Sequence, residues 1–255
     1  MTTVLKLGGS VITDKDSPET LDEAALDAAL DAVADAWRDG GDSRGQGNLV
    51  IVHGGGSFGH HHAAQRGVTA TEGTRDARDT VAIHDAMGRL NREVVGRLHD
   101  RGVDALPVRP LSVASRSADG ALDLPTGSVE RMLVEGFCPV LHGDGCVQSG
   151  AGVTILSGDD IVVALARSLP ADRIGLCSTV PGVLGGDGEV VERIDRFSDA
   201  EAALGGSDST DVTGGMAGKV RTLLDLPVPA HVFGPDGLAA FLDGDSPGTV
   251  VAGGE

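Results

Sequence analysis

The chain has 255 residues and carries 38 acidic against 20 basic residues, so its formal net charge is −18. Affinity for nucleic acids and for anionic membrane surfaces comes chiefly from Lys and Arg, and we therefore expect neither as a partner. Three lysines, five Phe, one Trp and no Tyr fit a halophile, whose concentrated salt screens the self-repulsion of an acidic chain. The alternative is an ordinary acidic protein.

The first predicted elements are a strand and a helix. Residues 4–12 are predicted as a strand that the pair Gly8 and Gly9 interrupts. The Thr-x-x-Glu pattern of Thr20 and Glu23 matches a capping box and predicts that a helix follows. The apolar residues of this helix have helical spacing up to the glycines that end it: Leu26, Ala29, Leu30, Val33 and Trp37.

The rest of the chain continues to alternate between strands and helices. The apolar run 49–52 is typical of a buried parallel strand. A second long helix, ended by Gly102, has the apolar stripe Ile83, Met87, Leu90, Val94 and Leu98. The later elements are predicted as strands over 103–108 and 139–141 with a loop or short hairpin at 110–126 between them, a helix from Ser157 to Pro170, a strand over 174–177, a helix over 214–224, and strands over 230–233 and 249–251.

This alternation predicts an α/β fold with a largely parallel sheet. We expect residues 1–170 and 171–255 to form two lobes of one composite domain that share the sheet. The three cysteines are odd in number and lack Cys-x-x-Cys spacing, which predicts buried thiols in a reducing compartment. The chain shows no basic-then-apolar leader and no apolar run of about 20 residues, so we expect a cytoplasmic protein.

A glycine-rich turn over residues 53–60, His-Gly-Gly-Gly-Ser-Phe-Gly-His, lies between the predicted strand 49–52 and a helix expected to begin near His61. Glycines let backbone N–H groups approach phosphate oxygens, and a helix N-terminus favours anions. The spacing matches neither the dinucleotide nor the P-loop pattern. His60 is placed to hydrogen-bond a substrate oxyanion, whereas His61 and His62 are expected at the surface. The alternatives are a purely structural turn and, less favoured, a metal site.

Of the three lysines, Lys6 and Lys219 lie in glycine-marked segments, and Lys15 lies in the turn Thr13-Asp14-Lys15 that follows the first of them. An ammonium donates in any direction and can follow a phosphoryl group during transfer, so this placement favours phosphate binding. The alternative for a lone lysine is a solvated surface group. Ser157 with Asp159 and Asp160 at a helix start is explained equally well as an N-cap with acids in the first turn.

These segments together resemble the amino acid kinase superfamily: residues 6–10 (Lys-Leu-Gly-Gly-Ser), the turn 53–60, residues 157–159 (Ser-Gly-Asp) and residues 213–219 (Thr-Gly-Gly-Met-Ala-Gly-Lys). Within it, the Gly-Ser-Phe-Gly-His ending and the Ile-Thr-Asp-Lys turn at 12–15 are similar to the isopentenyl phosphate kinases of the archaeal mevalonate route. The resemblance implies an open αβα sandwich, a homodimer, and ATP and Mg²⁺ as cofactors. It also implies an acceptor site in the N-terminal lobe and a nucleotide site in the C-terminal lobe.

Site residues follow from the resemblance position by position. Lys6, Gly8, Gly9 and Ser10 would meet the ATP phosphates, Lys15 would stabilise the transferring group, Gly214 and Lys219 would hold ATP from the C-terminal lobe, and Gly55 would face ATP. Gly54, Gly59 and His60 would bind the acceptor phosphate with Gly158 nearby. Thr179 is carried over as a nucleotide contact, although Thr179 and Pro181 replace acidic residues of the family pattern. No residue is assigned to a metal.

Two other functions stay open from the sequence. One is a kinase of the same fold that acts on a phosphonate such as fosfomycin or on a carboxylate. The other is a nucleotide-binding protein without catalysis, which the retention of Lys6, Lys15 and Lys219 disfavours.

Overall fold

The structure is a computed structural model that describes residues 1–39, 48–199 and 215–253. The helices are α1 (Gly9–Ile12), α2 (Glu23–Asp39), α3 (Gly56–Arg66), α4 (Ala77–Asp100), α5 (Gly127–Val134), α6 (Gly158–Ser168), α8 (Gly215–Leu224) and α9 (Leu238–Leu242), with 3₁₀ turns η1 (Pro110–Ser112) and η2 (Pro235–Gly237). The strands are β1 (Thr2–Leu7), β2 (Asn48–His53), β3 (Ala105–Pro107), β4 (Ser115–Arg116), β5 (Leu122–Asp123), β6 (Cys138–His142), β7 (Asp144–Gln148), β8 (Gly152–Leu156), β9 (Arg173–Cys177), β10 (Arg193–Ile194), β11 (Ala230–Phe233) and β12 (Thr249–Val251).

An eight-stranded sheet in the order β10-β12-β11-β9-β1-β2-β6-β3 forms the centre of the molecule. Its strands run parallel except for the antiparallel pair β11 and β12. The largely parallel α/β sheet predicted from the sequence is therefore confirmed. Because β1 pairs with β9, with β2 and β6 beyond β1 and β11 beyond β9, strands from both predicted lobes share the sheet. The division at residue 170 stays a prediction.

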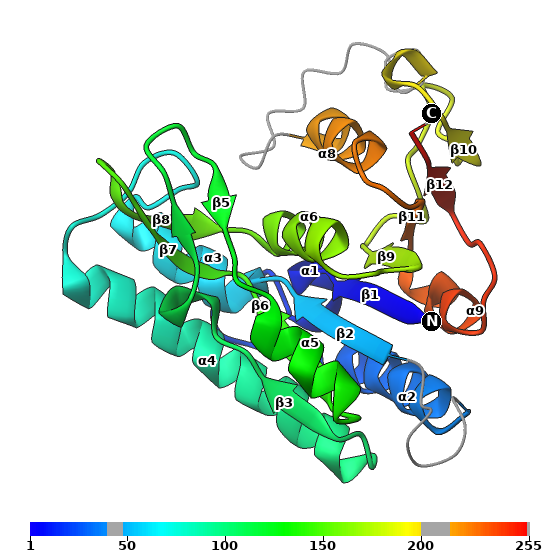
Figure 1. The fold of residues 1–255 in the computed structure, drawn as a ribbon, viewed down its shortest axis with the longest axis horizontal. Helices are drawn as coiled ribbons and strands as arrows, with labels where there is room; N and C mark the ends of the chain where they lie inside the picture. The colour runs from blue at the N-terminus through cyan, green and yellow to red at the C-terminus, as the bar shows by residue number, and fades with distance from the viewer. Residues whose placement is uncertain (40–47, 200–214, 254–255) are drawn as a thin grey trace.

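Helices cover both faces of the sheet (Figure 1). Strand residues alternate between the two faces: Val4 packs with α5, α6 and α8, whereas Leu5 and Leu7 pack with α1, α2, α4 and α9. The predicted stripes of α2 and α4 are confirmed, since every one of their apolar residues is buried in the core. The three cysteines are buried and free. In the described segments no helix is long and apolar enough to cross a bilayer.

A second sheet, in the order β5-β4-β7-β8, was only partly predicted. The short hairpin expected within 110–126 is confirmed as β4 and β5. The longer hairpin of β7 and β8 was not predicted. It packs through β7 against α4 and η1, at the end of the main sheet where β2 and β6 finish.

Three expectations about helix starts were wrong. Residues 9–12 form α1 rather than the end of a strand, because Gly8 N–H donates to Cys177 O (2.9 Å) and the chain then turns, burying Val11 and Ile12 together. Asp22 caps α2 by accepting from Ala25 N–H (3.0 Å), so the capping box of Thr20 and Glu23 does not form. Thr20 donates to Pro18 O, and Glu23 pairs with Arg97 of α4.

The third correction concerns α3, which begins at Gly56 and not near His61. Gly56 has φ +46°, a conformation that glycine adopts readily. The glycine-rich turn and the helix therefore overlap, and His60 lies on α3 itself, one turn after its first residue. The predicted end of α2 at the glycines after residue 39 lies outside the described residues.

Candidate active site

Glycine backbones make the closest packing of the site, at the carboxyl ends of β1 and β2. A Cβ on Gly9 would lie 2.1 Å from Gly56 N, and one on Gly54 would lie 2.5 Å from Gly9 N. Both contacts are with backbone, so neither neighbour can move away. Only glycines allow the turn after β1 and the turn after β2 to touch. Two segments predicted to bind phosphate are thus brought together.

The turn after β2 is also hydrogen-bonded to β1 and packed against Met87 of α4. Gly54 N–H donates to Leu7 O (2.9 Å) and joins the turn to β1. Gly55 lies between His60 and the buried Met87, since a Cβ there would be 3.5 Å from both His60 Cδ2 and Met87 Sδ. Gly59 faces the same methionine, whose Sδ would be 2.6 Å from a Cβ at this position. Met87 is therefore core beneath the turn, and His60 is exposed above it.

A carboxylate that the sequence did not single out joins two of the three lysines. Lys6 Nζ donates to Asp159 Oδ1 (2.7 Å), and Lys219 Nζ lies 3.8 Å from Asp159 Oδ2. Lys6 lies near the end of β1, Asp159 is in the first turn of α6 and Lys219 is on α8, so the bridge joins three elements. Burial raises the pKa of Asp159, but Lys6 and Lys219 outweigh it and hold that pKa below its ordinary value. The carboxylate stays ionised and keeps two ammonium groups side by side.

The start of α6 presents this carboxylate in a fixed geometry. Ser157 Oγ accepts from Asp160 N–H (3.1 Å), and Asp160 Oδ2 accepts from Ser157 N–H (3.1 Å), which completes a capping box. Arg116 of β4 donates to the same Asp160 carboxylate (2.8 Å). The N-cap interpretation of Ser157 and Asp160 is confirmed, and Asp159 is the residue left free to meet the lysines. Gly158 lies beside Lys6, since a Cβ there would be 3.2 Å from Lys6 Cε.

Two stacked histidines support the site from inside the sheet. His53 and His142 end the neighbouring strands β2 and β6 at the same register, and their ring centroids are 5.5 Å apart. Each ring places Nδ1 near the carbonyl of the next residue, 3.2 Å from Gly54 O and 2.9 Å from Gly143 O, so each Nδ1 carries the proton. Burial, reinforced by His142, lowers the pKa of His53 to about 3. Both rings are neutral supports of the turns, not reacting groups.

The other predicted residues have distinct places. Gly8 packs against the end of β9, where a Cβ would be 3.0 Å from Cys177 O, and Ser10 is exposed on α1. Thr179 is exposed in the bend that follows β9. Lys15 is exposed in the loop between α1 and α2. Gly214 lies outside the described residues.

One histidine was placed wrongly from the sequence. His62 is not a free surface residue, because its Nε2 donates to Glu19 Oε1 (2.5 Å) and its side chain is only 16% exposed. Glu19 was missed, and Asp159 was named only as an acid in the first turn of a helix and as part of the Ser-Gly-Asp segment, without its lysine partners. Within the described residues no group of three or more His, Cys, Asp or Glu side chains is arranged to hold a metal ion.

Chemically, the site offers two ammonium groups held by one carboxylate, beside helix starts whose first N–H groups lack intrahelical partners. Such N–H groups and cations bind phosphates. The described arrangement is therefore suited to binding phosphate groups.

Comparison with known proteins gives related chains of the same length. A model of the amino acid kinase family matches residues 1–228. A Haloferax volcanii protein named isopentenyl phosphate kinase is 64% identical over 98% of both chains. A Methanocaldococcus jannaschii protein of the same name is 33% identical over 91% of this chain and 90% of its own. A crystal structure of an isopentenyl phosphate kinase matches with a TM-score of 0.80 and 26% identity, covering 98% of this chain and all of that one.

Proposed function

Because the chain belongs to the amino acid kinase family, we propose that it transfers the γ-phosphoryl group of ATP to isopentenyl phosphate. The products are isopentenyl diphosphate and ADP. The two relatives at 64% and 33% identity carry the name of this activity. Together with the composition, the Haloferax volcanii relative supports a haloarchaeal source and a place in the archaeal mevalonate route.

The observation that carries the proposal is the bridge of Lys6, Asp159 and Lys219. It joins β1, on which the turn 53–60 also rests, to α8 in the C-terminal part of the chain. Asp159 prevents the two ammonium groups from repelling each other, so both can face the same polyanion. Phosphoryl transfer relies mostly on positioning and on compensation of charge, and this bridge supplies both.

The acceptor needs no general base in this mechanism. A phosphate monoester has a second pKa near 6, so its oxygen is already an anion at neutral pH. That oxygen attacks the γ-phosphorus of ATP, the bond to the β-phosphate oxygen breaks, and ADP leaves with the electron pair. His53 and His142 are neutral, which is consistent with this mechanism because no buried imidazole has to take a proton.

Roles for single residues are part of the proposal. Lys6, Gly8, Gly9 and Ser10 bind the ATP phosphates with Gly55, Thr179, Gly214 and Lys219, and Lys15 stabilises the transferring group. Gly54, Gly59, His60 and Gly158 bind the acceptor phosphate, His60 as a hydrogen-bond donor. Mg²⁺ arrives as MgATP, held by phosphates and water, since the described side chains form no dedicated cluster for it. We further propose a cytoplasmic homodimer.

The test is ADP release from MgATP in molar KCl, with isopentenyl phosphate, dimethylallyl phosphate, fosfomycin and acetylglutamate supplied separately. Release with the first two supports the proposal, and release with only the phosphonate or carboxylate replaces the acceptor class. ATP binding with no acceptor-dependent release identifies a non-catalytic protein.

A matched pair of histidine variants tests the acceptor site. His60→Gln should slow turnover of isopentenyl phosphate about 100- to 1,000-fold, the range lost when one positioned hydrogen-bond donor is removed. His61→Gln, at the next position of α3, should leave it unchanged. Equal rates for both variants would remove His60 from the site.

A further inference from the structure

The loop that carries Lys15 is fastened at both ends to one residue of the glycine-rich turn. At its start, Thr13 Oγ1 accepts from Ser57 N–H (3.0 Å). At its end, Ser57 Oγ donates to Thr20 O (3.0 Å), and Glu19 N–H donates to Ser57 O (3.2 Å). Asp14 N–H donates to Thr20 O and closes the loop on itself (3.0 Å). Lys15 therefore lies between two anchors on the N-terminal turn of α3.

The side chain of Glu19 extends this fastening to two helices. Oε1 accepts from His62 Nε2 of α3 (2.5 Å), and Oε2 accepts from both Nε and Nη2 of Arg89 of α4 (3.0 and 2.6 Å). Arg66 Nη1 donates to His62 Nδ1 (3.1 Å), which fixes the tautomer with the proton on Nε2. These hydrogen bonds, that from His62 foremost, hold the pKa of Glu19 below its ordinary value. We call Glu19, His62 and Arg89 the clasp.

The backbone conformation of Glu19 shows that surrounding contacts hold this residue in place. Its φ is +49°, and in the described residues it is the one non-glycine residue in the left-handed region. Such a conformation is strained for a residue with a Cβ and persists where surrounding contacts determine it. The clasp and the bond to Ser57 supply those contacts.

Lys15 differs from the other two lysines in its partners. Lys6 and Lys219 share Asp159, but in the described part of the chain no carboxylate lies within ion-pair distance of Lys15. The carboxylate of Glu19, four residues along the same loop, is turned to His62 and Arg89 instead. The clasp thus holds the loop and also keeps an acid away from its lysine.

We propose that Glu19 is a positioning residue for phosphoryl transfer, which acts through the clasp to hold Lys15 unpaired beside the glycine-rich turn. The inference rests on the proposed function, in which Lys15 stabilises the transferring group. The charge on that group changes only during transfer, so a displaced ammonium should lower kcat more than it raises KM for ATP. A misplacement of about 1 Å can cost about 100-fold in rate.

A double-mutant cycle tests whether Glu19 acts through Lys15. Glu19→Gln should lower kcat about 10- to 100-fold in the native chain, with KM for ATP changed less than about twofold. In a Lys15→Met background, where kcat is already low, Glu19→Gln should have no further effect. An equal loss in both backgrounds would overturn the positioning role. No loss from Lys15→Met would overturn it as well.

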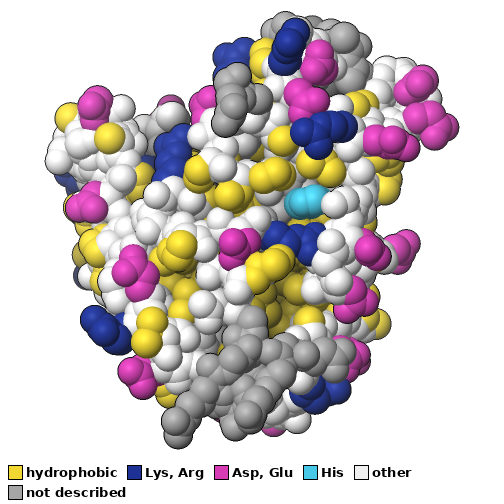
Figure 2. Space-filling view, turned by 45° about the vertical axis from the view of Figure 1, so that its right-hand side comes forward, with side chains coloured by type: hydrophobic (Ala, Val, Ile, Leu, Met, Phe, Trp, Pro, Cys, Tyr) yellow, Lys and Arg dark blue, Asp and Glu magenta, His cyan; other side chains and the backbone are white. Residues whose placement is uncertain are grey.

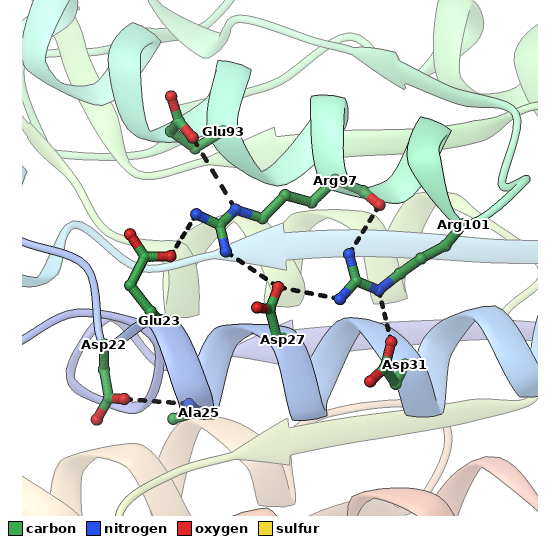
Figure 3. A network of polar contacts seen from close by, with 8 residues as sticks. All are labelled: Asp22, Glu23, Ala25, Asp27, Asp31, Glu93, Arg97 and Arg101. Atoms are coloured by element: carbon green, nitrogen blue, oxygen red, sulfur yellow. Dashed lines mark hydrogen bonds and ion pairs between the residues drawn. The ribbon is translucent and has the colours of Figure 1, made fainter.

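Asp27→Asn is the matched control. Asp27 of α2 accepts from Arg97 (3.0 Å) and Arg101 (2.9 Å) of α4, so this variant also removes a carboxylate that binds α4 through arginine (Figure 3). It touches neither the Lys15 loop nor the turn, and kcat should stay unchanged. A loss of kcat equal to that of Glu19→Gln would show that any weakened contact with α4 slows the enzyme.

A readout without activity separates this inference from the proposed function. Hydrogen exchange of the amides of residues 14–20 should speed up at least about tenfold in Glu19→Gln, while exchange in the core of α4 stays as in the native chain. Unchanged exchange in the loop would overturn the clasp even in an active enzyme. If the native chain turns over no phosphate acceptor, faster exchange would still show the clasp, but the proposed function and the catalytic role of Glu19 would both fail.

Discussion

The charge balance of the site depends on Asp159, whose carboxylate is shared by Lys6 and Lys219. Asp159→Asn would leave Lys6 and Lys219 close together without a compensating charge, so one ammonium should swing away. We expect kcat with isopentenyl phosphate to fall about 10- to 100-fold, about 1.4 to 2.7 kcal/mol of transition-state stabilisation. Steady-state kinetics in molar KCl check this. Asp160→Asn, next along α6, disturbs the cap but not the bridge, and an equal loss there would contradict the assignment.

The pH dependence of Asp159→Asn gives a second check on the same bridge. The folded pKa of Asp159 is lowered, so its stabilising contribution is present above the unfolded value near 4 and is lost as pH falls through the folded pKa. The difference in unfolding free energy between native and variant chains should therefore shrink as the pH falls below about 4. A difference that stays constant with pH would show that the carboxylate is not ionised in the folded state.

Gly9 is in close contact with backbone, whereas Gly96 has open space around it. The same substitution to Ala should therefore have opposite effects on stability at the two positions. Gly9→Ala would place a Cβ 2.1 Å from Gly56 N, and the two backbones would have to separate. We expect the free energy of unfolding to fall by about 3 kcal/mol or more, and activity to be lost with it. Gly96→Ala, at an exposed position near the C-terminal end of α4 with nothing within 4 Å of its Cβ, should gain about 0.5 to 1 kcal/mol. Urea unfolding measures both, and two changes of the same sign would contradict the contact.

At the scale of elements, the sequence predicts what is long and periodic. The apolar stripes of α2 and α4 repeat over several turns, so both helices and the residues on their buried faces could be predicted. The four residues of α1 are too few to show a period, and the start of α3 at Gly56 has no side-chain cap to mark it. The β7 and β8 hairpin is set largely by its packing against α4 and η1. Pairings between distant residues, such as Lys6 with Asp159, require the fold itself.

His53 and His142, the buried histidines that end β2 and β6, predict that the stability of the fold depends on pH. His53 has a folded pKa of about 3, and burial also lowers the pKa of His142 despite the nearby Asp144. As the pH falls below about 6.5, the unfolded chain takes up protons that the native chain does not. The free energy of unfolding should therefore decrease by about 1.4 kcal/mol per pH unit from His53, and His142 should add to this decrease.

Urea unfolding in molar KCl between pH 7 and pH 5 measures that slope. His53→Gln cannot titrate at this position and should reduce the slope by about one proton. The comparison uses slopes, so it holds even if His53→Gln is less stable at every pH. Equal slopes in the native chain and His53→Gln would contradict a neutral, buried His53.

At the scale of the whole molecule, the acidic side chains outnumber the basic ones, and on one face they are scattered and not gathered in one patch. On the face drawn in Figure 2, most Asp and Glu side chains lie toward the edges, and the middle mixes hydrophobic, basic and other side chains. Some carboxylates are paired, as between α2 and α4, where Arg97 and Arg101 bind Glu23, Asp27 and Asp31 (Figure 3). Twenty basic residues cannot neutralise 38 acidic ones. The remaining carboxylates repel one another until salt screens them.

This repulsion predicts a specific salt dependence. The Debye length falls from about 10 Å at about 0.1 M to about 3 Å at about 1 M, so the thermal midpoint should rise with KCl chiefly over this range. The triple variant Asp104→Asn, Asp123→Asn and Asp225→Asn removes exposed carboxylates that have no ion pair in the described chain. It should start from a higher midpoint at low salt and gain less from KCl. Sucrose acts by exclusion from the surface and not by screening, so it should raise both midpoints equally. Parallel increases of both proteins with KCl would show that exclusion, and not charge repulsion, sets the salt requirement.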